Sequence, residues 1–408
     1  MQIINYVHKV QGIDKVVPLL VCMKRINPGI NVHTVLDIER KALNQIPNDL
    51  LGILRSLGEV REKGVQGFFP SILSHSDEWL PKWLLRIAEL LAFGELSVRR
   101  QLNGLVKTPE GLILICIDTA KYRSIGRLLG KLVRSQGGEV VTYLKSVHDQ
   151  GRGLTVVGKA KREEAKDFSS LLLVPNARIR DVLVNSGYSE KAFLNSGYPP
   201  LYEFWREFAA VKAFETFPKF RDKDVVVIFS RGPVGHKQDD SQILTAEIEK
   251  RLTLDIIAAV RQLWPNAVIW IKPHPYQNLG FLESVEKSTP EVEIHHESVQ
   301  LLSAIASVAI STYSSASLEP LAHGKPSIEY FEETPNFLEA HPSGSVFGHF
   351  GVRICRSPSE LKRALVDARN ISADEREELT ARLIDKFEHE ENVQNVLTEL
   401  QTRLDLLR

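Results

Sequence analysis

DVVVIFS at residues 224–230 and AVIWIKPHP at residues 267–275 are short apolar runs separated by a long helical pattern around Ala246 to Leu263. The same alternation continues through four further apolar runs, at 292–296, 307–315, 326–331 and 352–355. Apolar runs that alternate with helices of this length favour a parallel sheet with right-handed crossovers. Residues 221–375 are therefore predicted to form a Rossmann-like, doubly wound α/β domain.

The first half of the chain shows the same pattern. Its apolar runs lie at 3–7, 32–38, 112–118, 139–144, 154–158 and 169–175, and FLNSGYPPLYEFW at 193–205 contains the last strand and the exit. We predict a second Rossmann-like domain over 1–205, with a helical insertion at about 70–106, and a crossover segment over 206–220. The remaining residues, 376–408, are predicted to form helices over the second domain. A length of 408 residues suits two such domains, facing each other across a cleft.

Composition excludes several classes of protein. Lys and Arg total 51, as do Asp and Glu, so no global field attracts nucleic acid or an anionic membrane. Cys22, Cys116 and Cys355 have no CxxC spacing, which is typical of a reducing compartment. MQIINYV reads as a strand rather than a signal peptide, and no apolar run approaches the roughly 18 residues of a membrane span. A cytoplasmic protein is expected.

The first candidate site is Lys272-Pro273-His274-Pro275, at the end of an apolar run. Lys272 and His274 each precede a proline, which favours an extended backbone. Residues i and i+2 of an extended segment point to the same side, so the ammonium and the imidazole should project together. This pair suits an anionic ligand such as a phosphate. The alternative is a turn with a structural histidine.

The second candidate site is STYSSASLEP at residues 311–320, where an apolar run enters a hydroxyl-rich loop and then a helix. Ser314 or Ser315 is expected to cap that helix, and its first N–H groups favour an anion. Glu319 follows one turn later on the same face, where a carboxylate could accept hydrogen bonds from a ribose. The alternative is a capped helix that binds nothing.

The third candidate site is SRGPVGHK at residues 230–237, directly after the first apolar run of the second domain. Its glycines would let backbone approach a ligand, and three side chains add positive charge: Gly232 and Gly235, with Arg231, His236 and Lys237. It matches neither a GxGxxG fingerprint nor a P-loop. In a parallel sheet all three sites should converge on the same edge.

Strand–KPHP, followed some 40 residues later by strand–loop–SSASLEPLAHGKP, resembles the nucleotide-binding domain of GT-B glycosyltransferases. The resemblance is nearest to bacterial sialyltransferases, polysialyltransferases and Kdo transferases, which share an HP motif and a Ser-rich motif. The segment 193–205 resembles the interdomain crossover of surface-polysaccharide transferases and of nucleotide-sugar epimerases. The resemblance implies that His274 contacts the donor phosphate and assists its departure. It also implies that Ser314 and Ser315 hold the phosphate and that Glu319 contacts the ribose.

The general base has no clear motif. Those sialyltransferases carry an acidic D/E-D/E-G motif, for which His148-Asp149-Gln150-Gly151 is a poor match. A transferase that inverts the anomeric centre needs a carboxylate or imidazole to take the acceptor's proton. By position at the ends of apolar runs, Asp118 and Asp149 rank narrowly above His8. Each is alternatively a cap or a solvated turn residue.

Neither a metal nor any other cofactor is expected. Asp222-Lys223-Asp224 spells DxD but precedes a strand, so it is interpreted as solvated charge. His295-His296 lacks the ordered spacing of a zinc site. Residues 79–102 intersperse tryptophans and leucines with basic residues, which suits either a helix at a membrane surface or a helix packed on its own domain or on a partner copy.

The favoured prediction is a glycosyltransferase of bacterial capsule or lipopolysaccharide assembly. Its donor would be CMP-Kdo or a CMP-linked sialic-type acid, and its acceptor a glycan or lipid-linked glycan. It would be cytoplasmic or peripheral at the inner membrane, with an oligomeric state left open and no nucleic acid partner. A UDP-sugar 2-epimerase or a CDP-polyol phosphotransferase of the same fold is the first alternative. A non-catalytic interaction subunit is the second.

Overall fold

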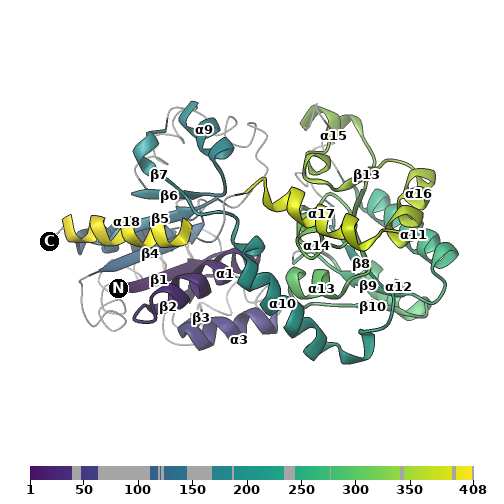
Figure 1. Ribbon diagram of the computed structural model, residues 1–408, viewed down its shortest axis with the longest axis horizontal. Helices are drawn as coiled ribbons and strands as arrows, with labels where there is room; N and C mark the ends of the chain where they lie inside the picture. Colours follow the sequence, from purple (N-terminus) through teal and green to yellow (C-terminus); the bar gives the residue numbers. More distant parts are fainter. Residues whose placement is uncertain are drawn as a thin grey trace, which may run out of the picture. The chain divides into compact units, whose positions relative to one another are not determined.

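The computed structural model forms two compact units (Figure 1). The first unit comprises Met1–Pro199 and Glu388–Arg408, and the second comprises Pro200–Phe387. The structure describes residues 1–38, 47–62, 111–117, 120, 124–144, 168–185, 188–233, 244–275, 277–340, 344–387 and 392–406. The predicted insertion at 70–106 and the predicted strand at 154–158 lie outside these residues.

The first unit is built on a parallel sheet with the strand order β3-β2-β1-β4-β5-β6-β7. The strands are β1 (Gln2–Val7), β2 (Asn31–Leu36), β3 (Gly58–Glu62), β4 (Leu112–Ile117), β5 (Glu139–Tyr143), β6 (Leu171–Val174) and β7 (Phe193–Asn195). Its described α-helices are α1 (Val10–Ile26), α3 (Asn48–Leu57), α6 (Ser124–Ser135), α9 (Ala177–Asn185) and α18 (Asn392–Leu406). All six residues of the central strand β4, LILICI, are buried. Such a run is typical of a parallel strand that is covered on both faces.

The second unit contains a parallel sheet with the strand order β10-β9-β8-β11-β12-β13. The strands are β8 (Val225–Phe229), β9 (Val268–Lys272), β10 (Val292–Ile294), β11 (Val308–Ser311), β12 (Ser327–Tyr330) and β13 (Arg353–Cys355). The α-helices are α10 (Glu203–Thr216), α11 (Ala246–Leu263), α12 (Gly280–Ser288), α13 (Val299–Ile305), α14 (Leu318–Ala322), α15 (Pro335–Ala340), α16 (Pro358–Arg369) and α17 (Ala373–Ile384).

Alternate residues of the central strands of the second unit enter two different cores. Val226 and Ile228 of β8 pack with residues of α11 and α16. Val225 and Val227 pack on the other face, with residues of α10 and α13. A period of two along a strand that is buried on both sides is the mark of a doubly wound sheet. The prediction of two doubly wound α/β domains is confirmed.

Strand β3 was absent from the predicted elements. Its sequence, GEVRE, is charged, and it forms the edge of the first sheet beside β2. A charged edge strand lacks the apolar run that identifies a central one. Gly58 begins it, and a side chain is excluded there because a Cβ would clash with the carbonyl oxygen of Val32.

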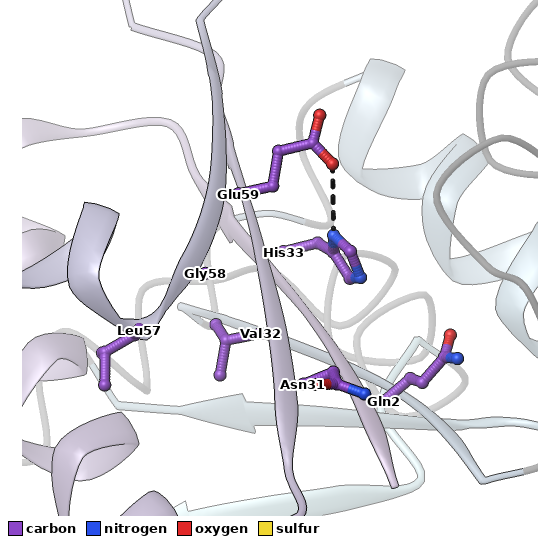
Figure 2. Close-up of a pocket in the computed structure, with 7 residues that line it drawn as sticks. All are labelled: Gln2, Asn31, Val32, His33, Leu57, Gly58 and Glu59. Atoms are coloured by element: carbon purple, nitrogen blue, oxygen red, sulfur yellow. Dashed lines mark ion pairs between the residues drawn. The ribbon is translucent and has the colours of Figure 1, made fainter.

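A cavity of about 260 Å³ lies at the amino ends of β1, β2 and β3 (Figure 2). Its lining residues are Gln2, Asn31, Val32, His33, Leu57, Gly58 and Glu59. The Nδ1 atom of His33 lies 3.5 Å from a carboxylate oxygen of Glu59. Ligands of open α/β sheets bind outside the carboxyl ends of the strands, and this cavity is at the opposite edge.

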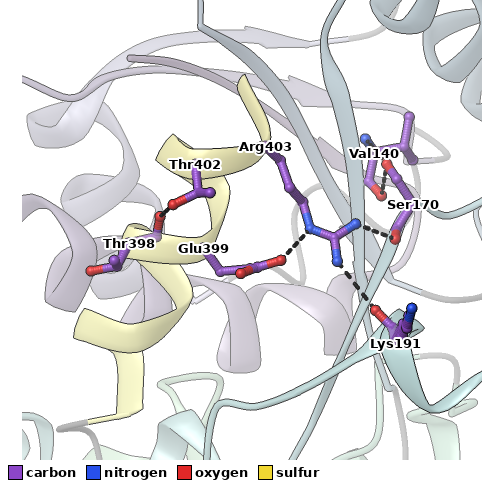
Figure 3. A network of polar contacts seen from close by, with 7 residues as sticks. All are labelled: Val140, Ser170, Lys191, Thr398, Glu399, Thr402 and Arg403. Atoms are coloured by element: carbon purple, nitrogen blue, oxygen red, sulfur yellow. Dashed lines mark hydrogen bonds and ion pairs between the residues drawn. The ribbon is translucent and has the colours of Figure 1, made fainter. Parts of the chain in front are cut away.

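The last helix, α18, belongs to the first unit, so the expectation that the tail lies over the second domain is wrong for this helix. Arg403 anchors it (Figure 3): the guanidinium donates to the carbonyl oxygens of Ser170 at 3.3 Å and Lys191 at 3.1 Å, and to the Glu399 carboxylate at 2.7 Å. The periodic apolar face of α18 is buried against the first unit. That period predicts a buried face without indicating which sheet covers it.

Helix α17, by contrast, remains in the second unit, where the Thr380 hydroxyl donates to the carbonyl oxygen of Leu321 at 3.0 Å. Among the described helices, no segment is both long and apolar enough to cross a membrane. Residues 79–102, predicted to contact either a membrane or a protein surface, lie outside the described part of the chain.

Candidate functional site

The three predicted sites of the second unit follow three neighbouring strands. Strand β8 lies between β9 and β11, and all three run in parallel, so the segments that leave them emerge at one edge. The backbone N–H of Ser230 donates to the carbonyl oxygen of Lys272 at 3.0 Å. The Arg231 guanidinium donates to the carbonyl oxygen of Tyr313 at 2.7 Å. The structure thus brings these segments together, and we call this group of loops the carboxyl edge.

Lys272 and His274 lie where β9 ends. Lys272 is the last residue of the strand and is 9% exposed, and its Nζ atom donates to the carbonyl oxygen of His296 at 3.4 Å. His274 is half-buried, and its backbone N–H donates to the side-chain oxygen of Gln277 at 3.0 Å. An ammonium and an imidazole are therefore close in the chain at the carboxyl edge. Because Lys272 is nearly buried, its charge would act in a region of low dielectric.

His295 lies beside this segment, on the chain that leaves β10. Its two ring nitrogens lie 3.1 Å from the carboxylates of Glu293 and Glu297. Partial burial disfavours the imidazolium, but the hydrogen bonds of Glu297 and Glu293 outweigh burial and raise the pKa of His295. The ring also packs on Trp270 of β9, with centroids 4.3 Å apart. These contacts fit a structural histidine at the sheet's edge.

Arg231 and Gly232 follow β8. Burial lowers the pKa of the Arg231 guanidinium from its ordinary value, although an arginine so shifted remains charged near neutrality. The hydrogen bond to Tyr313 joins Arg231 to residues 313–317, which we call the Ser-rich loop. Gly232 packs against Gln277: a Cβ at Gly232 would lie 3.0 Å from the Cγ atom of that residue. The glycine predicted for approach to a ligand thus also makes room for a buried side chain. Gly235, His236 and Lys237 lie outside the described residues.

The Ser-rich loop begins with a strained residue, Tyr313, which adopts a left-handed φ of 51°. Ser314 then caps a 3₁₀ turn over Ser315–Ser317, its hydroxyl accepting from the N–H of Ala316 at 3.3 Å. The helix that we predicted after the hydroxyl-rich loop is instead this turn followed by the five-residue α14. Glu319 is 7% exposed on α14. Gly324, with a φ of 63°, follows the end of the helix.

Two further buried groups at the second sheet carry no motif and were missed in the sequence. Gln277 contacts Ser230, Glu249 and His274. Glu329, on β12, pairs in register with Ser311 of β11 and is hydrogen-bonded to the Ser345 hydroxyl. Burial raises the pKa of Glu329 to about 7. A lone Gln or Glu in a polar or strand segment gives no sequence signal of such a role.

In the first unit, His8 follows β1, is 3% exposed and stacks on Tyr6 at 5.7 Å. Asp37 follows the neighbouring strand β2 and accepts a 2.6 Å hydrogen bond from the Tyr6 hydroxyl. Asp37 was not among the predicted bases, although it directly follows a strand. His8 and Asp37 therefore lie at the carboxyl ends of adjacent strands. The preferred base candidates, Asp118 and Asp149, lie outside the described residues.

The DxD triplet, Asp222-Lys223-Asp224, precedes β8 and so lies at the amino end of that strand, away from the carboxyl edge. The carbonyl oxygen of Asp224 accepts from the N–H of Val268 at 2.9 Å, and its carboxylate accepts from the Ser307 hydroxyl at 3.4 Å. The three residues are exposed and lie in the turn that precedes β8.

No protein-family model matches this chain, and no curated protein matches it either. Solved structures share its fold. A UDP-GlcNAc 2-epimerase from Neisseria meningitidis bound to UDP-GlcNAc has a TM-score of 0.62 and 13% identity, covering 98% of this chain and 100% of its own. MnaA from S. aureus, solved with UDP, has a TM-score of 0.57 and 11% identity, covering 99% and 97%.

A third solved structure with this fold is the wall teichoic acid polymerase TagF, soaked with CDPG. It has a TM-score of 0.56 and 12% identity, covering 99% of this chain and 88% of its own. These likenesses extend over nearly the whole chain and show that it has the GT-B-type, two-domain α/β fold. At such low identity they show the fold alone.

Proposed function

We propose that this protein is an enzyme that binds a nucleotide-activated sugar at the carboxyl edge of its second sheet and breaks the bond to the leaving nucleotide. The observation that carries the proposal is the meeting of Arg231, Lys272 and His274 with the Ser-rich loop at the ends of three adjacent strands. Clustered cations and hydroxyls at this edge are suited to bind a phosphate. Loops with a purely structural role would not require such a cluster.

Each residue of the cluster has a definite chemical part in this proposal. Lys272 would neutralise phosphate charge that develops as the nucleotide departs, and His274 would donate a hydrogen bond or a proton to a phosphate oxygen. The hydroxyls of Ser314 and Ser315 would hold the same phosphate. Glu319, on the helix that follows, would accept hydrogen bonds from the ribose hydroxyls. Arg231 would fix the Ser-rich loop through the carbonyl oxygen of Tyr313.

The solved structures of the same fold support a nucleotide ligand, because they were determined with UDP, UDP-GlcNAc or CDPG. Two reactions follow from the proposal. In the first, the sugar is transferred to a glycan acceptor, with CMP-Kdo or a CMP-linked sialic-type acid as the donor favoured by the motifs. In the second, UDP and the C2 proton leave a UDP-sugar and are added back with the opposite configuration at C2, without an acceptor. The epimerases among the solved structures favour this reaction.

Turnover of one activated sugar is expected when purified protein is incubated separately with UDP-GlcNAc, a CMP-linked sialic acid, CMP-Kdo and a CDP-polyol. Release of nucleotide and isomerisation of the sugar are followed by ³¹P NMR and mass spectrometry, with and without a glycan acceptor. Isomerisation of the sugar at C2 without acceptor identifies epimerisation, and nucleotide release that rises with acceptor identifies transfer. His274→Ala should lower the rate about a hundredfold, because proton transfer and phosphate stabilisation both depend on the imidazole.

The matched control is His349→Ala, since His349 is an exposed histidine of the same unit, on the 3₁₀ turn Phe347–Phe350. Its rate should equal that of the wild type. If folded wild-type protein turned over none of the four compounds with or without acceptor, these two reactions would be excluded. A rate that His274→Ala leaves intact would remove the imidazole from the chemistry.

A further inference from the structure

The side chain of Gln277 connects three elements of the carboxyl edge. Gln277 follows β9 and is 6% exposed. Its Oε1 atom accepts from the backbone N–H of His274 at 3.0 Å, while its Nε2 atom donates to the Ser230 hydroxyl at 2.8 Å and to the Glu249 carboxylate at 2.5 Å. Ser230 follows β8, and Glu249 belongs to α11. One carboxamide therefore joins two strand ends and a helix.

The orientation of this carboxamide is determined by its partners. An amide offers an oxygen that only accepts and a nitrogen that only donates. The oxygen faces a backbone N–H, and the nitrogen faces a carboxylate and a hydroxyl, so a flipped amide would oppose donor to donor and acceptor to acceptor. A second bond reinforces the arrangement, because the backbone N–H of Gln277 donates to the carbonyl oxygen of His274 at 2.9 Å.

Glu249 supplies the fixed end of this network. It is 7% exposed, and burial raises the pKa of its carboxyl group, against the hydrogen bond from Gln277. Its backbone carbonyl also accepts from the Thr253 hydroxyl at 2.9 Å within α11. On the other side, the absence of a side chain at Gly232 leaves the space in which Gln277 lies. A buried polar network with satisfied partners holds its members in one arrangement.

We propose that Gln277 is a positioning residue that fixes the backbone of His274, and with it the direction of the imidazole, relative to a bound nucleotide phosphate. Glu249 and Ser230 orient Gln277 in turn. The inference rests on the proposed function, since it takes His274 as the residue that contacts the phosphate. It extends that function to a side chain which does not itself reach the ligand.

The test combines two measurements on Gln277→Met, which keeps the side-chain length and removes the hydrogen bonds. The first is the imidazole ¹H–¹⁵N spectrum of His274 in nucleotide-free protein, assigned by the signals lost in His274→Ala. The second is the dissociation constant for UDP by calorimetry. We expect the His274 signals to move. We also expect the affinity for UDP to fall about tenfold, because the backbone of His274 loses the hydrogen bond that fixes it. Gln300→Met is the control, because Gln300 is 3% exposed in α13 and bonds to His323 instead.

A charge swap separates positioning from a general loss of packing. Gln277→Glu places two buried carboxylates against each other and should weaken UDP binding further. Adding Glu249→Gln restores one carboxylate and one amide at the same two positions, so the double variant should regain an affinity within about threefold of the wild type. Unmoved His274 signals in Gln277→Met, or a double variant no better than Gln277→Glu, would overturn the inference. If wild-type protein bound no UDP, the proposed use of UDP would fail, and the nucleotide-free spectrum would still decide whether Gln277 holds His274.

Discussion

Glu329→Gln is expected to stabilise the second unit by about 3 kcal/mol at pH 8.5 and to have little effect at pH 4. Glu329 is 2% exposed on β12, and burial raises its pKa to about 7 from the ordinary value of 4.5. Between these two values the unfolded chain loses its proton while the folded protein keeps it. The wild type therefore loses stability as the pH rises from about 4.5 to about 7. The Glu329→Gln variant does not, because its side chain carries no charge at any of these pH values.

The measurement is urea-dependent hydrogen exchange, read by mass spectrometry from peptides of β8 and β11, at pH values corrected for intrinsic exchange. This local readout follows the second unit even if the two units unfold separately. Glu283→Gln, an exposed position on α12, serves as the control for loss of a negative charge and should show no such gain. A difference between Glu329→Gln and wild type that is independent of pH would contradict the assignment of a raised pKa.

Trp270→Ala should lower the free energy of unfolding of the second unit by about 3–5 kcal/mol. Trp270 lies on β9 with no exposed surface, and its ring contacts Phe217 at 4.7 Å, Phe220 at 4.9 Å and His295 at 4.3 Å between centroids. Removing it leaves a cavity behind the strand that ends at Lys272. The loss of stability should therefore be accompanied by weaker nucleotide binding.

The same exchange measurement checks this prediction. Leu254→Ala on α11 is the comparison, because that leucine is 50% exposed and its replacement should change stability by less than about 0.5 kcal/mol. A loss below about 1 kcal/mol for Trp270→Ala would mean that the aromatic cluster of Phe217, Phe220, Trp270 and His295 does not form as described.

The sequence predicts the doubly wound architecture well because parallel strands buried on both faces read as apolar runs. LILICI and VVVIF are strands for this reason, and the residues that follow such runs fall at the carboxyl ends of their own sheets by topology alone. Lys272, His274, Arg231 and the Ser-rich loop were found in this way. Strand β3 was missed because its charged sequence, GEVRE, lacks that signal.

The sequence does not predict which side chains far apart in the chain contact each other. Gln277 contacts Glu249, 28 positions away in the chain, and no pattern connects the two. Likewise, the apolar period of α18 predicts burial but does not indicate the first unit as its partner. Asp37 was missed because the apolar run at 32–38 continues past it to Ile38, whereas the strand itself ends at Leu36. Its hydrogen bond with Tyr6, by contrast, depends on the pairing of β1 and β2.

The most direct test of the central claim is calorimetric titration of the protein with UDP, CMP, CDP and GDP. We predict that at least one of these nucleotides binds with one site per chain and that His274→Ala and Lys272→Ala each weaken binding about tenfold or more, while His349→Ala does not. The absence of binding by any nucleotide to folded wild-type protein, or binding that both His274→Ala and Lys272→Ala leave unchanged, would contradict a nucleotide site at the carboxyl edge of the second sheet.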